Sequence, residues 1–235
     1  MERTAAVVLA AGKGSRMGST IHKQYMELCG KPLLYHTLRA FEESSVDEIV
    51  LVTGPGEVPF CQNEIVDRYG FSKISAVTEG GKERFHSVYA GLKAVGDCAY
   101  VLIHDGARPC VTKEIIEASR VAAIRYGACV VGMPVKDTIK ISDENGYAAL
   151  TPDRTSLWQI QTPQAFRYDL VLRAYNRLMD SESFQKRVTD DAMVVETMTK
   201  EKVKLIQGDY TNIKVTTPED LEIASVFLNR IYGKK

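Results

Sequence analysis

The sequence has no long hydrophobic run, little histidine and no paired pattern of cysteines. No stretch approaches the roughly 18 consecutive apolar residues of a membrane-spanning helix, so none is expected. The 4 histidines are scattered without metal-ligand spacing, which argues against a zinc site built by the protein. The 5 cysteines are odd in number and far apart, so reduced, mostly buried thiols are expected rather than a zinc knuckle or a disulfide framework.

The chain also lacks net charge. Its 30 Lys and Arg balance 30 Asp and Glu, which gives no electrostatic reason to expect nucleic acid or a membrane surface as a partner. A predicted strand begins within a few residues of Met1 and leaves no room for a signal peptide, so a cytoplasmic protein is expected. With 235 residues, 45% of them hydrophobic, the chain is long enough for a single domain spanning residues 1–235.

Short apolar runs alternate along the chain with segments that have apolar residues at helical spacing. This alternation predicts an α/β, Rossmann-like fold with a mostly parallel central sheet and helices on both faces. The predicted strands are Ala5–Leu9, Glu48–Thr53, Lys73–Val77, Ala99–Ile103, Ala128–Gly132 and Lys202–Gln207. The predicted helices are Pro32–Glu43, Val58–Tyr69, Glu83–Val95, Thr112–Tyr126, Tyr168–Met179, Thr189–Met198 and a terminal helix from Pro218.

An inserted β-hairpin is predicted where this alternation breaks after Met133. Polar and apolar residues alternate over Lys136–Ser142, a strong turn signal follows, and Tyr147–Leu150 can form the return strand. An isolated two-stranded ribbon is marginally stable in water, so we expect residues 136–155 to form a protruding β-arm that packs on a second copy of the chain. The alternative is a hairpin folded back on its own domain.

The segment from Leu9 to Gly18 follows the first predicted strand and combines glycines with cations. Glycines let backbone N–H groups approach an anion, while Arg16 and, further on, Lys23 supply positive charge, so we expect a loop that wraps a polyphosphate. The glycine spacing does not fit a dinucleotide fingerprint, because Met17 occupies its sixth place, and the Gly-Lys-Ser/Thr end of a P-loop is missing. An ordinary strand-to-helix turn is the alternative.

A second polar segment, His104-Asp105-Gly106-Ala107-Arg108-Pro109, follows another predicted strand. Ligands of parallel sheets bind at the carboxyl ends of the strands, so this segment and the glycine-rich loop are expected to face one crevice. Taken alone, Asp105 could instead hold its own turn through a side-chain-to-backbone hydrogen bond. His104 is expected to be a structural residue rather than a base or a metal ligand.

Eight short blocks, in order along essentially the whole chain, share the pattern of one known family. They are Leu9-Ala10-Ala11-Gly12, Lys23-Gln24-Tyr25, Gly80-Gly81-Lys82-Glu83-Arg84 with Ser87, His104 to Pro109, Asp153-Arg154, Thr162-Pro163-Gln164, Thr189-Asp190-Asp191 and Asn212 to Thr216. In these blocks the chain resembles the 2-C-methyl-D-erythritol 4-phosphate cytidylyltransferases of the non-mevalonate isoprenoid pathway. Two positions depart from the pattern: Lys82 stands where this family has an acidic residue, and Gly106 where a second alanine is common.

The resemblance implies a role for each matching residue. Arg16 and Lys23 would stabilise the transition state at the α-phosphate of CTP, and Lys214 would orient the attacking phosphate of the acceptor. Arg154 would contact that phosphate from the arm of the neighbouring subunit of a homodimer. The nucleotide would be bound by Ala10, Ala11, Gly12, Gly81 and Ser87, the acceptor polyol phosphate by Asp105, Arg108, Thr162 and Thr189, with Arg84 as a further substrate-binding residue.

The cationic character of these residues suits the implied reaction. A phosphate monoester attacks the α-phosphorus of the nucleoside triphosphate, and its second pKa of about 6 makes it an anion near neutral pH, so no general base is required. The chemistry needs fixed cations and a metal instead. We expect Mg²⁺ bound mainly through substrate phosphates, since this ion keeps waters and takes few protein ligands. Taken singly, each of these Lys and Arg residues could also be an ordinary solvated side chain.

Two other functions compete with this reading. A pentitol phosphate cytidylyltransferase acting on ribitol 5-phosphate would need nearly the same phosphate machinery and would differ in its polyol pocket. A non-catalytic nucleotide-binding module is the alternative from a different class, and a dehydrogenase is disfavoured by the glycine spacing. The cytosine preference and the acceptor rest on the resemblance alone.

Overall fold

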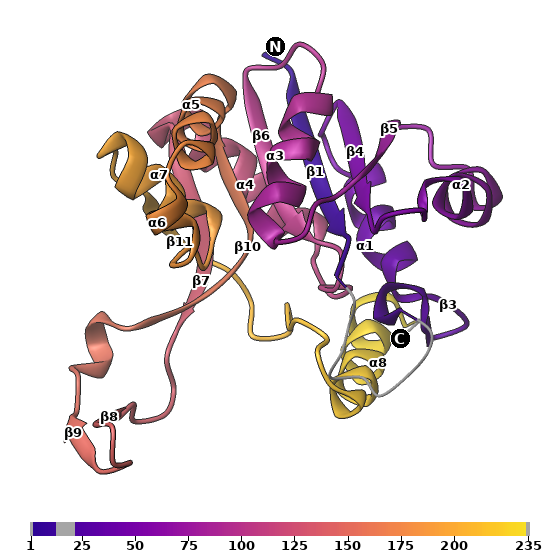
Figure 1. Ribbon diagram of the computed structural model, residues 1–235. Coiled ribbons are helices and arrows are strands. Elements are labelled where there is room, and N and C mark those ends of the chain that lie inside the picture. Colours follow the sequence, from indigo (N-terminus) through magenta and orange to yellow (C-terminus); the bar gives the residue numbers. More distant parts are fainter. Residues whose placement is uncertain (1, 13–21, 234–235) are drawn as a thin grey trace.

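A seven-stranded sheet with helices on both faces forms the body of the computed structural model, which describes residues 2–12 and 22–233 (Figure 1). The strands lie in the order β11-β7-β10-β6-β1-β4-β5, and β10 alone runs antiparallel to its two neighbours. Their bounds are β1 Thr4–Ala10, β4 Glu48–Thr53, β5 Ile74–Glu79, β6 Tyr100–Asp105, β7 Ala128–Pro134, β10 Trp158–Arg167 and β11 Lys204–Gln207. The predicted α/β, mostly parallel fold is confirmed.

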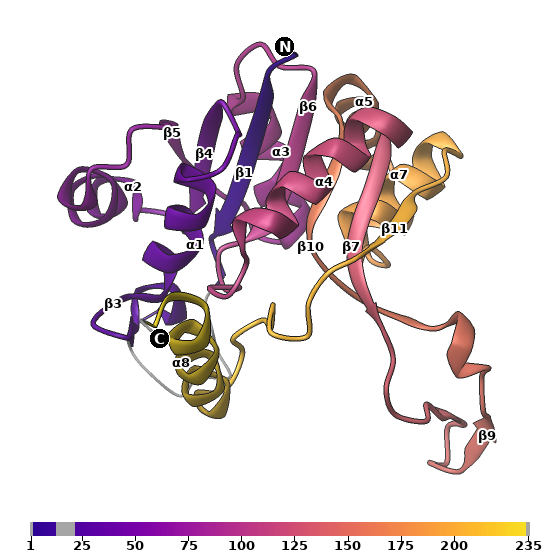
Figure 2. The same ribbon diagram turned by 180° about the vertical axis from the view of Figure 1, so that it is seen from behind.

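The helices cover the sheet because its strands are apolar on both sides. Ala6 and Val8 of β1 belong to the core under α1 and α4, whereas Ala5 and Val7 belong to the core under α3, α5 and α7. Figures 1 and 2 show these two helical layers from opposite sides. The helices are α1 Leu33–Glu42, α2 Val58–Cys61 continued by the π-helix η3 Gln62–Asp67, α3 Arg84–Ala94, α4 Lys113–Tyr126, α5 Tyr168–Met179, α6 Glu182–Gln185, α7 Asp191–Thr199 and α8 Pro218–Tyr232.

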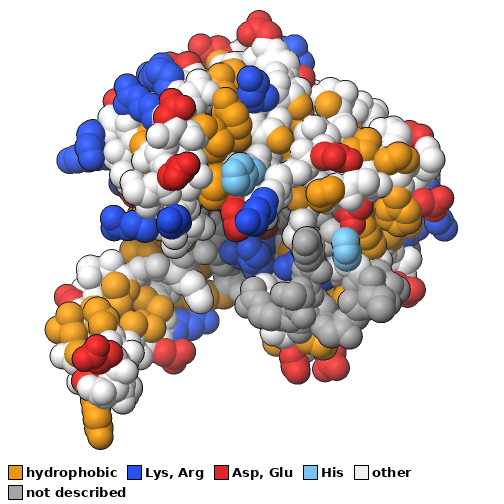
Figure 3. Space-filling model, in the orientation of Figure 1, with side chains coloured by type: hydrophobic (Ala, Val, Ile, Leu, Met, Phe, Trp, Pro, Cys, Tyr) orange, Lys and Arg blue, Asp and Glu red, His pale blue; other side chains and the backbone are white. Residues whose placement is uncertain are grey.

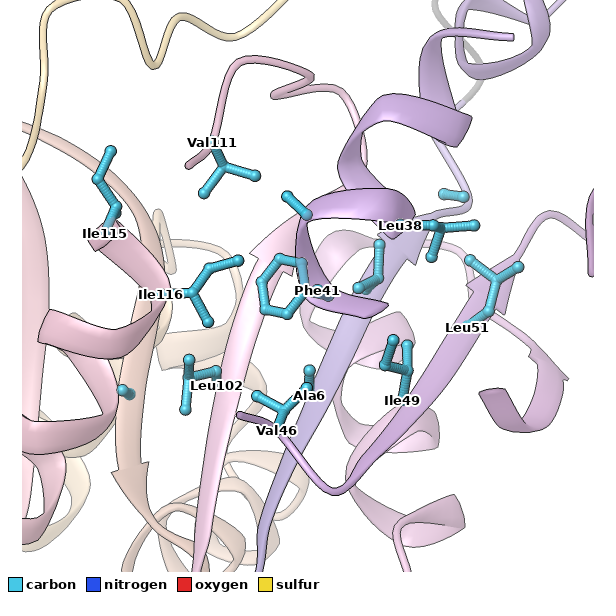
Figure 4. Packing of buried hydrophobic residues seen from close by; sticks show 14 of the residues in the cluster. Ala6, Leu38, Phe41, Val46, Ile49, Leu51, Leu102, Val111, Ile115 and Ile116 are labelled. Carbon is cyan, nitrogen blue, oxygen red and sulfur yellow. The ribbon is translucent and has the colours of Figure 1, made fainter. Parts of the chain in front are cut away.

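Phe41 shows how a helix is fixed on the sheet. Its fully buried ring lies between α1 and the strands, in the same cluster as Leu102 of β6 and Ile116 of α4 (Figure 4). Burying such a side chain contributes about 1.5–3 kcal/mol relative to leaving it in water. Packing of this kind holds α1 and α4 against β1 and β6, the two strands that carry the predicted ligand-binding segments.

The strand β10 is the main element of the sheet that the sequence pattern does not predict. It runs from Trp158 to Arg167 and pairs antiparallel with both β6 and β7. The segment contains Pro163 and three glutamines, so it lacks the continuous apolar run that predicts a buried strand. Its pairing is interrupted between Ile160 and Gln164, which accommodates the proline.

Several predicted boundaries shift by one or two residues. His104 and Asp105 are the last two residues of β6 rather than the start of a loop. α1 begins at Leu33 after an extended Pro32, and α7 begins at Asp191, two residues later than predicted. Thr112 caps α4 by accepting a hydrogen bond from the Ile115 amide.

Two smaller units flank the carboxyl ends of the parallel strands (Figures 1 and 2). One is α8, which packs on Ala107, Val215 and the short pair β2 Glu27–Leu28 and β3 Lys31–Pro32. The other is the predicted insertion, with short strands β8 Ile141–Ser142 and β9 Ala148–Leu150 and the 3₁₀ turn η4 Arg154–Ser156. The insertion extends away from the sheet and does not fold back on it.

None of the helices within residues 2–12 and 22–233 is both long enough and apolar enough to cross a membrane.

Candidate active site

A cleft of about 690 Å³ lies at the carboxyl ends of the parallel strands. Around the corresponding hollow, Lys and Arg side chains gather on the face drawn in Figure 3. The lining comes from the end of β1, from the 3₁₀ turn η2 (Lys23–Tyr25), from residues 80–84 and Ser87, and from Asp105 and Lys214. Segments more than 200 residues apart in sequence therefore meet here.

Most of the predicted site residues line this cleft. They are Ala10, Ala11, Gly12, Lys23, Gly81, Arg84, Ser87, Asp105 and Lys214. Thr189 lines an adjoining cavity of about 580 Å³, which shares Lys82, Glu83 and Arg84 with the cleft. The two spaces together could hold a nucleotide and a second, smaller ligand.

Three predicted site residues lie elsewhere. Thr162 and Arg108 are buried beneath the cleft rather than on its lining. Arg154 lies on the insertion, where its guanidinium donates to the Lys136 carbonyl at 2.8 Å. Arg16 lies outside the described residues.

The Asp105 carboxylate is held between two cations. Arg84 Nε donates to its Oδ1 at 3.2 Å, and Lys214 Nζ lies 2.7 Å from its Oδ2. Burial raises the pKa of this carboxyl, but Arg84, Lys214 and the nearby Arg108 lower it more, so the net pKa is well below the ordinary value. Asp105 is therefore a carboxylate throughout the neutral range, with lone pairs left to accept hydroxyl hydrogen bonds.

Arg84 is itself fixed by a second carboxylate. Its two terminal nitrogens, Nη1 and Nη2, each donate to one oxygen of Asp191 at 2.8 Å, a bidentate ion pair. The hydroxyl of Tyr175 donates to the same carboxylate at 2.5 Å. Asp191 and Tyr175 are fully buried. Neither was among the predicted site residues, because no sequence signal pairs positions 84 and 191.

The side chains of the turn η2 tie it to the end of β1 and to the segment before α8. Gln24 Nε2 donates to the carbonyl of Ala10 at 2.6 Å, and Lys23 Nζ donates to the carbonyl of Val215 at 3.0 Å. The Val215 amide in turn donates to the Ala107 carbonyl at 2.8 Å. Lys23 and Lys214 are thereby brought to the same side of the cleft. The role of Gln24 was missed by the sequence reading.

The start of α3 also faces the cleft. Glu83 is its N-cap, Arg84 its first residue, and both line the space. The buried Ser87 hydroxyl accepts a hydrogen bond from the Gly81 amide at 3.2 Å, which orders the turn before the helix. Helix N-termini attract anions through unpaired N–H groups and the helix dipole.

The departure at Gly106 has a steric explanation. A Cβ at this position would lie 2.8 Å from the Leu9 carbonyl oxygen and 2.9 Å from Leu34 Cδ1. Here the backbone of residue 106 approaches β1 closely, and its amide donates to the Leu9 carbonyl at 2.8 Å. The other departure, Lys82, is exposed at the rim shared by the two cavities.

His104 lies under the cleft and is fully buried. Its Nδ1 shares a hydrogen bond of 2.9 Å with the Thr162 hydroxyl, which also accepts from the Asp105 amide at 3.1 Å. Burial lowers the pKa of His104 to about 3 despite the neighbouring Asp105, so the imidazole is neutral at physiological pH. His104 thus supports the backbone of Asp105, as expected of a structural residue.

The described residues contain no group of three or more His, Cys, Asp and Glu placed to hold a metal ion. All five cysteines are free thiols. Burial raises the pKa of Cys61 and Cys98 to about 11 and of Cys110 and Cys129 to about 12, so these four are protonated and unreactive near neutral pH.

Comparisons with known proteins agree with one another. A family model described as 2-C-methyl-D-erythritol 4-phosphate cytidylyltransferase matches residues 4–230. Proteins of that name from Alkaliphilus oremlandii and Lachnospira eligens are 52% and 54% identical, over 97% and 95% of this chain and 96% and 98% of theirs.

Solved structures give the same match. The crystal structure of 4-diphosphocytidyl-2C-methyl-D-erythritol synthase from Anaerococcus prevotii has a TM-score of 0.85 at 34% identity, covering 97% of both chains. That of 2-C-methyl-D-erythritol 4-phosphate cytidylyltransferase from Thermus thermophilus has a TM-score of 0.75 at 30% identity, covering 97% of this chain and 100% of the other.

Burial of a neutral His104 predicts a pH-dependent stability. The imidazole titrates near 6.5 in the unfolded chain and near 3 in the folded one, so its contribution is complete above pH 6.5 and is lost as the pH falls toward 3. The free energy of unfolding of the wild type should fall by about 1 kcal/mol more between pH 6 and pH 5 than that of His104→Asn. Urea unfolding at the two pH values measures these free energies. An equal change in the wild type and in His104→Asn would contradict the prediction.

Proposed function

The chain belongs to the 2-C-methyl-D-erythritol 4-phosphate cytidylyltransferase family, and we propose that its cleft carries out the reaction of that family. This reaction transfers a cytidylyl group from CTP to 2-C-methyl-D-erythritol 4-phosphate, giving 4-diphosphocytidyl-2-C-methyl-D-erythritol and pyrophosphate. The observation that carries the proposal is the convergence of Lys23, Arg84, Asp105 and Lys214 beside the N-terminus of α3. These groups present cations for phosphates beside a carboxylate that can accept hydroxyl hydrogen bonds.

The reaction needs positioned charge rather than a protein base. An oxygen of the acceptor phosphate forms a bond to the α-phosphorus of CTP while the bond from that phosphorus to the β-phosphate oxygen breaks, and pyrophosphate leaves as an anion. No proton has to be removed from an already ionised phosphate. Fixed cations lower the barrier by stabilising the charge that spreads over the transferring phosphoryl group.

We assign the cations by their places around the cleft. Lys23 is proposed to act at the α-phosphate, together with Arg16, and Lys214 to orient the acceptor phosphate. The nucleotide is proposed to contact the end of β1, residues 10–12, and the turn formed by Gly81 and Ser87.

The acceptor polyol is proposed to lie on the other side of the cleft. Asp105 would accept its hydroxyls, and Thr189 lines the adjoining cavity on that side. Arg108 and Thr162 would support the acceptor site from below, where Arg108 donates to the Asn212 carbonyl at 2.8 Å and Thr162 accepts from the Asp105 amide.

Mg²⁺ is proposed as the metal, held mainly by the substrate phosphates. Asp105 and Glu83 are the carboxylates on the cleft lining, and both oxygens of Asp105 already accept from cations. A small protein contribution suits Mg²⁺, which keeps several waters. When bound, the ion would neutralise charge on the triphosphate and its leaving group.

A homodimer is proposed, with residues 136–155 as an arm that reaches the neighbouring subunit. The arm carries exposed apolar side chains, and Tyr147 is 74% and Leu150 57% exposed, which favours burial against another chain. Arg154 sits at the base of this arm, away from the cleft of its own chain, and so could serve the partner's cleft.

We propose that the enzyme works in the cytoplasm. Its five free cysteines suit a reducing compartment.

Pyrophosphate release tests the reaction directly. With CTP, release should depend on 2-C-methyl-D-erythritol 4-phosphate, and kcat/KM with ribitol 5-phosphate should be lower by about tenfold or more, because a site built around one polyol leaves polar groups unpaired with another. CTP turnover without an acceptor, or equal rates with both acceptors, would refute the assignment.

Loss of the Lys23 ammonium should destabilise the transition state more than it destabilises bound CTP. Lys23→Ala should lower kcat by about 10² or more with a much smaller change in KM for CTP, the scale of removing one preorganised donor. Lys31→Ala removes a lysine outside the cleft and should leave kcat within about twofold. Steady-state kinetics measure both, and an unchanged kcat in Lys23→Ala would rule out this role.

Arm exchange predicts complementation between inactive variants. Arg154→Ala and Lys23→Ala, mixed after dissociation and reassociation, should recover about a quarter of wild-type activity, because half of the dimers are mixed and each of these has one intact site of two. If Arg154 serves its own chain, every site carries a lesion and no activity returns.

The matched control for this mixture is Lys23→Ala with Asp105→Asn. Each lesion then lies in the cleft of its own chain, so every site carries one lesion whichever chain supplies Arg154, unless the two bodies exchange residues. Recovery in this control, or an active monomer, would contradict the shared site.

A further inference from the structure

A buried chain of hydrogen bonds runs from the core to the cleft. It starts at the Tyr175 hydroxyl in the middle of α5, passes through the Asp191 carboxylate at the start of α7, and reaches the Arg84 guanidinium at the start of α3. Arg84 Nε then donates to Asp105 in the cleft. Tyr175 and Asp191 are both 0% exposed, so neither can touch a ligand in the cleft.

This arrangement leaves Arg84 a single orientation. A guanidinium is planar, and its two terminal nitrogens are both used on the two oxygens of Asp191. The direction of the Nε–H bond is then set, and it points at Asp105 Oδ1. The position of the Asp105 carboxylate, fixed from the other side by Lys214, therefore depends on Asp191.

Tyr175 fixes Asp191 in turn. A buried carboxylate is costly unless it is paired and hydrogen-bonded, and the Tyr175 hydroxyl supplies a third donor beside the two from Arg84. Burial and the Asp191 charge raise the pKa of the Tyr175 phenol well above its usual value, so the hydroxyl is a hydrogen-bond donor near neutral pH.

We propose that Asp191 and Tyr175 are positioning residues, which hold Arg84 and through it Asp105 in the geometry that binds the acceptor polyol. The inference rests on the proposed function, because that function makes Asp105 an acceptor-binding group. The same anchor also places Thr189, which lies two residues before Asp191 and lines the adjoining cavity.

The nucleotide side of the cleft is held by different contacts. Gln24 fixes the Ala10 carbonyl, and Ser87 fixes the Gly81 turn, neither through Asp191. A loosened Asp191 should therefore impair binding of the acceptor and leave binding of CTP nearly unchanged.

Tyr175→Phe is the most direct test, since it removes one hydroxyl and keeps the ring in the core. Its control is Tyr168→Phe in the same helix, where the lost hydroxyl donates to the Leu92 carbonyl at 2.8 Å, away from the cleft. Tyr175→Phe should lower kcat/KM for 2-C-methyl-D-erythritol 4-phosphate about tenfold and change KM for CTP less than twofold, the scale of losing a supporting hydrogen bond. Tyr168→Phe should leave both constants within about twofold.

Hydrogen exchange of the Arg84 Nε–H, measured by NMR, tests the same chain of hydrogen bonds and does not require enzyme activity. Exchange should be slow in the wild type and in Tyr168→Phe and at least about tenfold faster in Tyr175→Phe. Unchanged exchange in Tyr175→Phe would overturn the inference. Equal losses for acceptor and CTP, or equal losses in the two variants, would overturn it too, because they indicate general destabilisation.

The two readouts separate this inference from the proposed function. A wild type that releases no pyrophosphate refutes the cytidylyltransferase assignment, and with it the acceptor role of Asp105. The exchange rates would still decide whether Tyr175 holds Arg84.

Discussion

The Asp105 carboxylate, paired with Arg84 on one oxygen and Lys214 on the other, is the contact on which the cleft depends. A charge at the buried end of β6 would cost several kcal/mol if it were unpaired. Satisfying it draws together the start of α3 and the segment before α8, which otherwise share little. Through Arg84 the pairing extends to Asp191, so the start of α7 is fixed by the same charge balance.

The sheet decides where this carboxylate meets the glycine-rich segment. In the parallel pairing of β1 with β6, Leu9 lies opposite Asp105. The residues that follow Leu9 must therefore leave the sheet beside the carboxylate. Gly106 allows its own backbone and that of Leu9 to approach closely at this point. The register of β1 against β6, which is set by apolar packing on both faces of the sheet, therefore determines the geometry of this polar site.

Local sequence patterns predict the elements whose burial is uniform along the strand. Buried parallel strands are apolar throughout, so β1, β4, β6 and β7 could be predicted, and so could the cleft at their ends. β10 could not, because its proline and glutamines are tolerated only by pairing between two neighbours far away in the chain. The bidentate pair of Arg84 with Asp191 could not be predicted for the same reason. It joins the starts of two helices that only the packing of α3, α5 and α7 brings together.

The positive charge of the described cleft is largely neutralised by carboxylates of the same site. Lys23, Lys82, Arg84 and Lys214 line it, but Glu83 and Asp105 line it too, and Asp191 neutralises Arg84 from below. This balance keeps the unliganded site stable, yet it leaves too little positive charge for a triphosphate and a second phosphate together. The missing charge has to come from outside these residues. Mg²⁺ carried by the nucleotide, Arg16, and Arg154 from a partner's arm are the proposed sources, and the Mg²⁺ and Arg154 would arrive only with the nucleotide and the second subunit. A site built in this way would bind its two anions strongly only when fully assembled, which places the cationic stabilisation in the reacting complex rather than in the resting enzyme.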